Sequence, residues 1–96
     1  MTEDFLAAFE ALPRGTVQGV AHGRRYVVSR TQAVGGRAEK LVAHALGGSD
    51  YISLNLYRLA RGARLKPCEM PEAKVVAFVL ALRPEAEPSR DTPELT

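Results

Sequence analysis

The chain has a single cysteine, only two histidines and no long apolar run, and each shortage excludes a class of protein. One thiol cannot form an internal disulfide, and His22 and His44 lie too far apart in sequence for zinc-ligand spacing. The longest apolar run, from Val75 to Leu82, falls well short of the roughly 20 residues of a membrane-spanning helix. We therefore expect no metal, no cofactor and no membrane contact, and a fold held together by packing.

Acidic residues are scarce in the middle of the chain. Ten of the 13 basic residues fall between Arg14 and Lys66, where only Glu39 and Asp50 oppose them, so this segment has a formal charge of +8. Each flanking segment carries −3, which leaves the net charge of +2. Because a patch of one sign concentrates ligands of the opposite sign, the segregation predicts a polyanionic partner, either nucleic acid or an acidic protein.

The length of 96 residues fits one domain with a modest core. The N-terminus, Met1-Thr2-Glu3-Asp4, is acidic where a secretory signal would be basic, so we expect a cytoplasmic protein. We place the globular domain at residues 1–83. Residues 84–96 combine prolines with charged and small polar residues, a composition typical of a disordered tail.

The first third of the chain predicts a helix and a hairpin. Thr2 is a suitable N-cap for a helix whose apolar residues recur on one face up to Leu12, before Pro13 ends it. Two β-patterned runs, 16–21 and 24–31, then flank His22-Gly23, which is typical of a two-residue hairpin turn. This register sets Val17 against Val28 and Gly19 against Tyr26.

A second helix is predicted from Arg37 to Leu46. Gly35-Gly36 precedes it, Gly47-Gly48 follows it as a C-terminal stop, and its apolar residues fit a helical stripe. On this helix Arg37, Lys40 and His44 would share the polar side.

The clearest strand pattern runs from Tyr51 to Leu59, where apolar and polar residues alternate. A turn at Arg61-Gly62 returns the chain so that Arg64 and Lys66 lie on the same side as Tyr57. Pro67 closes this second hairpin.

A final helix, Glu72 to Leu82, begins after Pro71 and stops before Pro84. Its apolar residues occupy more than one stripe, which indicates either deep burial or a shared surface. A homodimer interface would cover the surplus. The expected contacts are Val75, Val76, Phe78, Val79 and Leu82.

Together these elements predict an α+β fold with an N-terminal helix followed by ββαββα. We expect a four-stranded, mostly antiparallel sheet with the helices packed on one face. The outer face would then gather polar, basic and aromatic side chains. They are Gln18, Arg25, Ser29, Thr31, Tyr51, Ser53, Asn55, Tyr57, Arg64 and Lys66.

This outer face suggests a non-enzymatic module that binds RNA or single-stranded DNA, because bases stack on aromatic rings and cations follow the phosphates. The ligand-binding candidates are Arg25, Tyr51, Ser53, Asn55, Tyr57, Arg64 and Lys66. An ordinary solvated sheet face is the alternative interpretation. The alternative function is a homo-oligomeric adaptor that uses the apolar final helix.

Two smaller motifs have their own candidate chemistry. Gly35-Gly36-Arg37 would lie at a helix start, where backbone N–H groups favour an anion such as phosphate, although a connection of this kind needs glycine in any case. Cys68 lies just before a helix N-terminus, which lowers a thiol pKa, so a thiol-dependent enzyme is a third hypothesis. The alternative for Cys68 is a small buried apolar residue.

Overall fold

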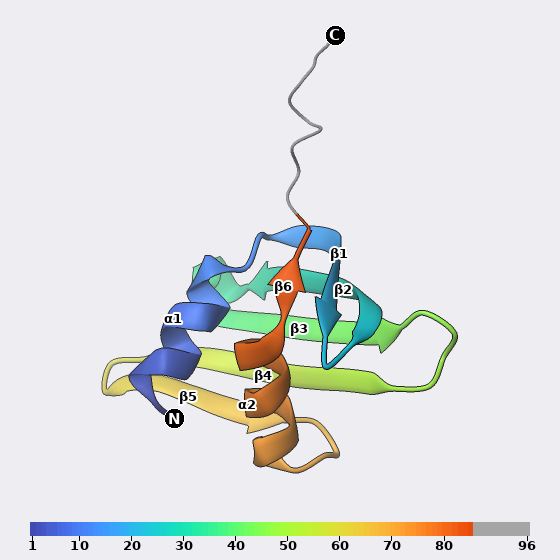
Figure 1. Ribbon diagram of the computed structural model, residues 1–96. Helices are drawn as coiled ribbons and strands as arrows, with labels where there is room; N and C mark the ends of the chain where they lie inside the picture. The colour runs from blue at the N-terminus through green and yellow to red at the C-terminus, as the bar shows by residue number, and fades with distance from the viewer. Residues whose placement is uncertain (86–96) are drawn as a thin grey trace, which may run out of the picture.

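A computed structural model describes residues 1–85, apart from the side chain of Val34, and shows one antiparallel sheet with two helices on one of its faces (Figure 1). The strand order is β5-β4-β3-β2-β1-β6. The elements are, in chain order, α1 (Glu3–Ala11), β1 (Gly15–Ala21), β2 (Arg24–Ala33), the 3-10 turn η1 (Val34–Gly36), β3 (Ala38–Ala45), β4 (Tyr51–Leu59), β5 (Gly62–Pro67), α2 (Glu72–Ala81) and β6 (Arg83–Pro84).

The predicted α+β class is confirmed, and so are the first helix and the first hairpin. Thr2 caps α1, because its side-chain oxygen accepts a hydrogen bond from the Phe5 backbone N–H at 3.1 Å. His22 and Gly23 have φ values of 52° and 74°, the two positive values that a type I′ turn requires. That turn fixes the predicted register, with Val17 opposite Val28.

The predicted helix from Arg37 to Leu46 is wrong, because most of this segment is the central strand β3. Its apolar residues satisfy a period of two as well as a helical period, and the buried side chains are Glu39, Leu41, Ala43 and Ala45. β3 pairs along its length with both β2 and β4, so two hydrogen-bonded ladders outweigh local helix preference. Five strands therefore lie between the two helices in the sequence, and β6 follows the second helix. The predicted ββαββα order with four strands is replaced by a six-stranded sheet.

The sixth strand, β6, follows α2 and adds to the free side of β1. Gly19 permits this close approach, since a Cβ there would lie 2.9 Å from Leu82 Cδ1 and 3.0 Å from the Arg83 carbonyl oxygen. The Glu85 N–H continues the edge by donating to the Gln18 carbonyl at 2.9 Å. The tail predicted for residues 84–96 lies, from residue 86 on, outside the described residues.

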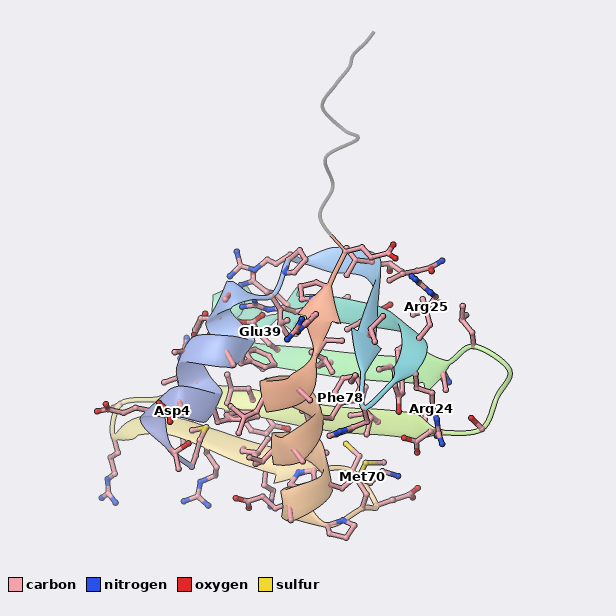
Figure 2. The ribbon with its side chains drawn as sticks, viewed as in Figure 1. Asp4, Arg24, Arg25, Glu39, Met70 and Phe78 are labelled. Carbon is pink, nitrogen blue, oxygen red and sulfur yellow. The ribbon has the colours of Figure 1, made fainter. Side chains whose placement is uncertain are left out.

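The final helix forms as predicted, but its apolar residues pack within the domain. Val75, Phe78, Val79 and Leu82 are all buried, and the Phe78 ring meets the Tyr26 ring edge-on at 4.7 Å. Figure 2 shows Phe78 between α2 and the sheet. A six-stranded sheet offers a wider apolar face than the four strands expected, so it covers the residues assigned to a homodimer contact. Of that set only Val76 is partly exposed.

Within residues 1–85, neither helix has the length and apolar content needed to cross a bilayer.

Candidate functional site

Both helices lie on the same side of the sheet, so its other side carries no helix (Figure 1). We call this side the open face and the helix-packed side the covered face. The strand registers place the following side chains on the open face: Thr16, Gln18, Val20, Arg25, Val27, Ser29, Thr31, Ala38, Lys40, Val42, His44, Tyr51, Ser53, Asn55, Tyr57, Leu59, Arg64 and Lys66.

All seven predicted ligand-binding residues share the open face. Arg25, Tyr51, Ser53, Asn55, Tyr57, Arg64 and Lys66 belong to β2, β4 and β5. Because β3 lies between β2 and β4, Lys40 and His44 join them, opposite Asn55 and Tyr51 respectively. Sequence reasoning had put these two residues on a helix and so left them out of the sheet face.

Charge on the open face has one sign. None of the open-face positions of β1 to β5 carries a carboxylate. Within residues 1–85, Lys40, Arg64 and Lys66 form no ion pair, whereas Arg25 pairs with Glu85 beside the β6 edge. Three cations therefore remain available to a ligand on this side of the sheet.

The two open-face tyrosines are solvent-accessible. Tyr51 is 43% exposed and Tyr57 36% exposed. The His44 ring lies 4.9 Å from the Tyr51 ring at an interplanar angle of 45°, so the two form one aromatic surface near the β3–β4 turn. Tyr57 stands at the opposite end of β4, between Ala38 on β3 and Arg64 on β5.

A shallow cavity of about 360 Å³ adjoins Tyr57. Its lining comes from the start of β3 and from the end of β4 with the following turn. The lining residues are Arg37, Ala38, Tyr57, Arg58, Leu59 and Ala60. The small side chain of Ala38 leaves room beside the Tyr57 ring, and the cavity volume falls in the range of roughly 300–1,000 Å³ that small ligand groups occupy.

Ser53, Asn55 and Cys68 lie closer to the protein interior. Ser53 is 1% exposed, so its hydroxyl is not presented to a ligand in this conformation. The Asn55 side-chain amide donates to the Cys68 Sγ at 3.4 Å, and Cys68 itself is half-buried. Among residues 1–85 no histidine nitrogen is hydrogen-bonded to this thiol, so the Cys–His pairing of an activated nucleophile is not formed.

The predicted anion site at Gly35-Gly36-Arg37 loses its physical basis. These residues form the β2–β3 connection, in which Gly35 and Gly36 have φ values of 62° and 91°. A strand follows instead of a helix, so neither a helix dipole nor a row of helix N–H groups is present there. Arg37 instead lines the cavity beside Tyr57.

The covered face holds a charge cluster that sequence reasoning missed, in which Arg30 and Glu39 are buried and Glu10 and Arg58 are partly exposed. Arg30 is 3% exposed and Glu39 1% exposed, and they form a bidentate pair through Nε–Oε1 at 2.6 Å and Nη2–Oε2 at 3.1 Å. This hydrogen bonding with Arg30 holds the pKa of Glu39 below its ordinary value against the opposing effect of burial. Figure 2 shows Glu39 on the helix side of the sheet.

Arg30 also ends α1. Its Nη1 donates to the Phe9 carbonyl at 3.1 Å and to the Leu12 carbonyl at 2.6 Å, so a cation satisfies acceptors at the helix C-terminus. Arg58 completes the cluster, pairing with Glu10 and placing Nη1 2.7 Å from Glu39 Oε2. Thus two of the ten central cations are neutralised inside the fold.

A second polar cluster ties the β3–β4 turn to α2. Asp50 accepts a hydrogen bond from the Tyr26 hydroxyl at 2.7 Å and pairs with Lys74 Nζ at 2.9 Å. Hydrogen bonds from Lys74 and then Tyr26 lower the pKa of Asp50 from 3.8 to about 2. Both central carboxylates of the sequence, Glu39 and Asp50, are therefore structural groups bound to their own cations, on the covered side and at the turn.

Comparison of the chain with protein families, with curated proteins and with solved structures gives no match. Among residues 1–85 no three histidine, cysteine or carboxylate side chains gather as metal ligands. A function can therefore be inferred only from the side chains of the open face and their surroundings.

Proposed function

We propose that the open face binds single-stranded nucleic acid, either RNA or single-stranded DNA, as a non-enzymatic module. The observation that carries the proposal is a sheet face with two exposed tyrosines, three unpaired cations within the described residues and no carboxylate on β1 to β5. The phosphates of a nucleic acid complement the positive charge of this face, and its bases can stack on the two tyrosine rings.

Each part of the face has a defined role in this proposal. Tyr51 and Tyr57 provide stacking surfaces at the two ends of β4, and each stacked base contributes about 1–3 kcal/mol. Lys40, Arg64 and Lys66 lie on the neighbouring strands β3 and β5, where they contact the phosphates that connect the stacked bases. Stacking tolerates any base, so we expect little sequence preference.

The cavity beside Tyr57 accommodates a base that stacks on that ring. Its lining includes the aliphatic groups of Ala38 and Leu59, and Leu59 is 52% exposed. An apolar hollow next to an aromatic ring suits the flat face and edge of a base, while the exposed Arg37 at its border suits the adjoining phosphate.

The experiment is a titration of a labelled single-stranded oligonucleotide with the protein at several salt concentrations, followed by fluorescence anisotropy. We expect log Kobs to fall linearly with log salt, by about 0.7 per phosphate neutralised on a single strand. An oligomer of abasic sites should bind more weakly, because it offers phosphates without bases.

Replacing Lys40, Arg64 and Lys66 with glutamine should lower the salt slope by about 2, at roughly 0.7 per cation. Arg14→Gln is the control, since Arg14 is an exposed cation outside the strands that form the open face. Absence of binding by the wild-type protein at low salt would end the proposal, and equal effects of the triple variant and the control would place binding elsewhere.

A further inference from the structure

β5 is an edge strand whose outer side pairs with no other strand among residues 1–85. The Cys68 N–H donates to the Ser53 carbonyl at 3.0 Å, which marks Ser53 and Cys68 as a hydrogen-bonded pair of the antiparallel ladder. Such pairs alternate with pairs that make no mutual hydrogen bonds. Residues 64 and 66 therefore bond to β4, while Ala63 and Leu65 direct their backbone N–H and C=O groups outward.

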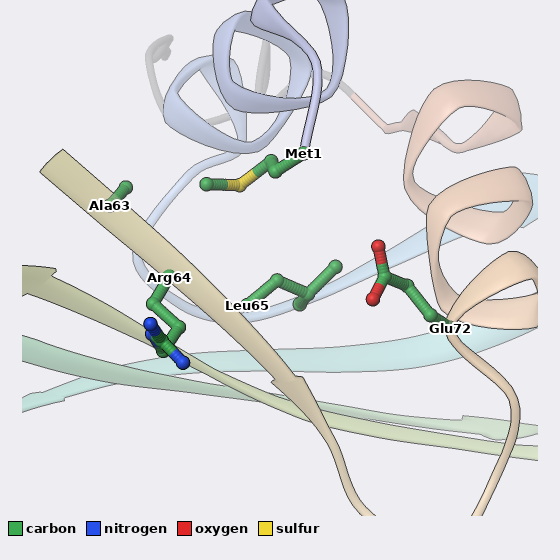
Figure 3. A pocket seen from close by; sticks show the side chains of 5 residues that line it. All are labelled: Met1, Ala63, Arg64, Leu65 and Glu72. Carbon is green, nitrogen blue, oxygen red and sulfur yellow. The ribbon is translucent and has the colours of Figure 1, made fainter.

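A hollow of about 250 Å³ lies along this edge, and its lining residues are Met1, Ala63, Arg64, Leu65 and Glu72. Figure 3 shows the hollow between the start of α1, β5 and the start of α2. Leu65 points into it, while Arg64 extends from the other side of the strand. Ala63 and Leu65, whose backbone groups point outward, form its apolar lining together with Met1, and Glu72 adds a carboxylate at the α2 side.

The charges on β5 discriminate between partners. Arg64 and Lys66 lie on the open face of the strand and have no ion pair within residues 1–85. An antiparallel second copy of β5 would set these cations against each other, and like charges directly opposite are destabilising. A strand with acidic residues opposite Arg64 and Lys66 would instead be stabilised by pairs of opposite charge.

We propose that the outer edge of β5 binds an extended acidic peptide segment of another protein by strand addition. The backbone of the added strand hydrogen-bonds to Ala63 and Leu65. Its side chain opposite Leu65 enters the hollow and is apolar, and the side chains opposite Arg64 and Lys66 are Asp or Glu. The recognised pattern is acidic–apolar–acidic.

This interaction goes beyond nucleic-acid binding and uses a different part of the molecule. The edge and the hollow are formed by β5 and the two helix starts, whereas Tyr51 and Tyr57 belong to β4. Arg64 and Lys66 contribute to both surfaces, so Ala63→Pro, which changes neither residue, is the variant that separates the two proposals.

The test uses the full chain and a capped octapeptide of alternating Glu and Val, with a Lys–Val octapeptide as control. Amide hydrogen exchange is followed by NMR. With the acidic peptide at ten times its Kd, we expect exchange of the Ala63 and Leu65 amides to slow about tenfold. The basic peptide should leave both amides unchanged.

Ala63→Pro removes one outward N–H without removing a hydrogen bond to β4, which is the position an edge strand tolerates. We expect this variant to bind the acidic peptide at least tenfold more weakly while its oligonucleotide affinity stays at the wild-type value. The double variant Arg64→Glu/Lys66→Glu changes two exposed positions of the same strand. It should reverse the peptide preference, so that the Lys–Val peptide binds and the Glu–Val peptide does not.

Three outcomes would overturn the inference. One is acidic-peptide binding that leaves the Ala63 and Leu65 amides unprotected. Another is protection of these amides that rises with protein concentration alone, which would identify a second copy as the occupant. The last is equal binding of the acidic and basic peptides. Failure of oligonucleotide binding would not affect any of these readouts.

Discussion

The two faces of the sheet use positive charge in opposite ways. On the covered face, Arg30 is buried and contacts Glu39, Glu10 and the end of α1. On the open face, Lys40, Arg64 and Lys66 have no carboxylate partner within residues 1–85. The comparison teaches that a cationic stretch of sequence mixes charges that build the fold with charges that are offered to a partner.

The covered-face and open-face cations also differ in how much they contribute to stability. Removing one member of a buried ion pair costs about 3–5 kcal/mol because the other charge stays buried and unpaired. An exposed pair is worth about 0–1 kcal/mol. Substitution of a covered-face cation should therefore change stability, and substitution of an open-face cation should change binding.

The largest expected effect is on the covered face. Arg30→Met leaves Glu39 buried without its bidentate partner and the α1 carbonyls without a donor, so unfolding free energy should fall by about 3–5 kcal/mol. Chemical denaturation measures it. In the double variant Arg30→Met/Glu39→Leu much of this loss should be recovered, since no buried charge is left. A loss below about 1 kcal/mol for the single variant would show the cluster to be a surface feature.

The next effect is on the open face. Tyr57→Ala should weaken oligonucleotide binding by about 1–3 kcal/mol, or roughly 5- to 150-fold, because one stacked base loses its ring. Its stability should change little, since the side chain is 36% exposed. Anisotropy titration gives the affinity and chemical denaturation the stability. A variant that loses stability but keeps affinity would reverse the assignment of the two faces.

The third expectation concerns Asp50, in the turn between β3 and β4. Its folded pKa of about 2 lies below the ordinary 3.8, so its stabilisation is present above pH 4 and is lost as pH falls towards 2. Asp50→Asn should lower unfolding free energy at pH 7 by about 1–2 kcal/mol, after allowance for partial exposure. The difference from wild type should vanish near pH 2. A constant difference across this range would contradict the pKa assignment.

The smallest effect concerns Arg25, which among residues 1–85 is the one open-face cation with an ion-pair partner. Both it and Glu85 are almost half exposed, so Glu85→Gln should change stability by less than about 1 kcal/mol. The same variant releases Arg25 to contact a phosphate and should steepen the oligonucleotide salt slope by about 0.7. An unchanged slope would remove Arg25 from the interface.

Local patterns predicted the elements whose shape is set by neighbouring residues. The Thr2 cap, the His22-Gly23 turn and the alternation from Tyr51 to Leu59 each encode their geometry within a few residues, and all three were confirmed. The His22-Gly23 turn also fixed the register of the first hairpin. In the second hairpin, Arg64 and Lys66 lie on the same side of the sheet as Tyr57, as predicted.

The segment from Arg37 to Leu46 shows where local reasoning fails. Its apolar spacing fits a helix and a strand equally, and only pairing with β2 and β4 decides between them. The same error hid Lys40 and His44 from the open face. The position of Glu39 could have indicated the buried charge cluster. It continues the alternation of Leu41, Ala43 and Ala45, and a charged side chain at a core-facing strand position requires a buried partner.

The chain's three tyrosines allow a direct test of the account, because Tyr26 is 2% exposed on the covered face whereas Tyr51 and Tyr57 are on the open face. Their ring signals can be followed by NMR in a tyrosine-labelled sample while a single-stranded oligonucleotide is added. We expect the Tyr51 and Tyr57 signals to shift and the Tyr26 signals to stay unchanged. Shifts confined to Tyr26, or none at saturating oligonucleotide, would contradict this expectation.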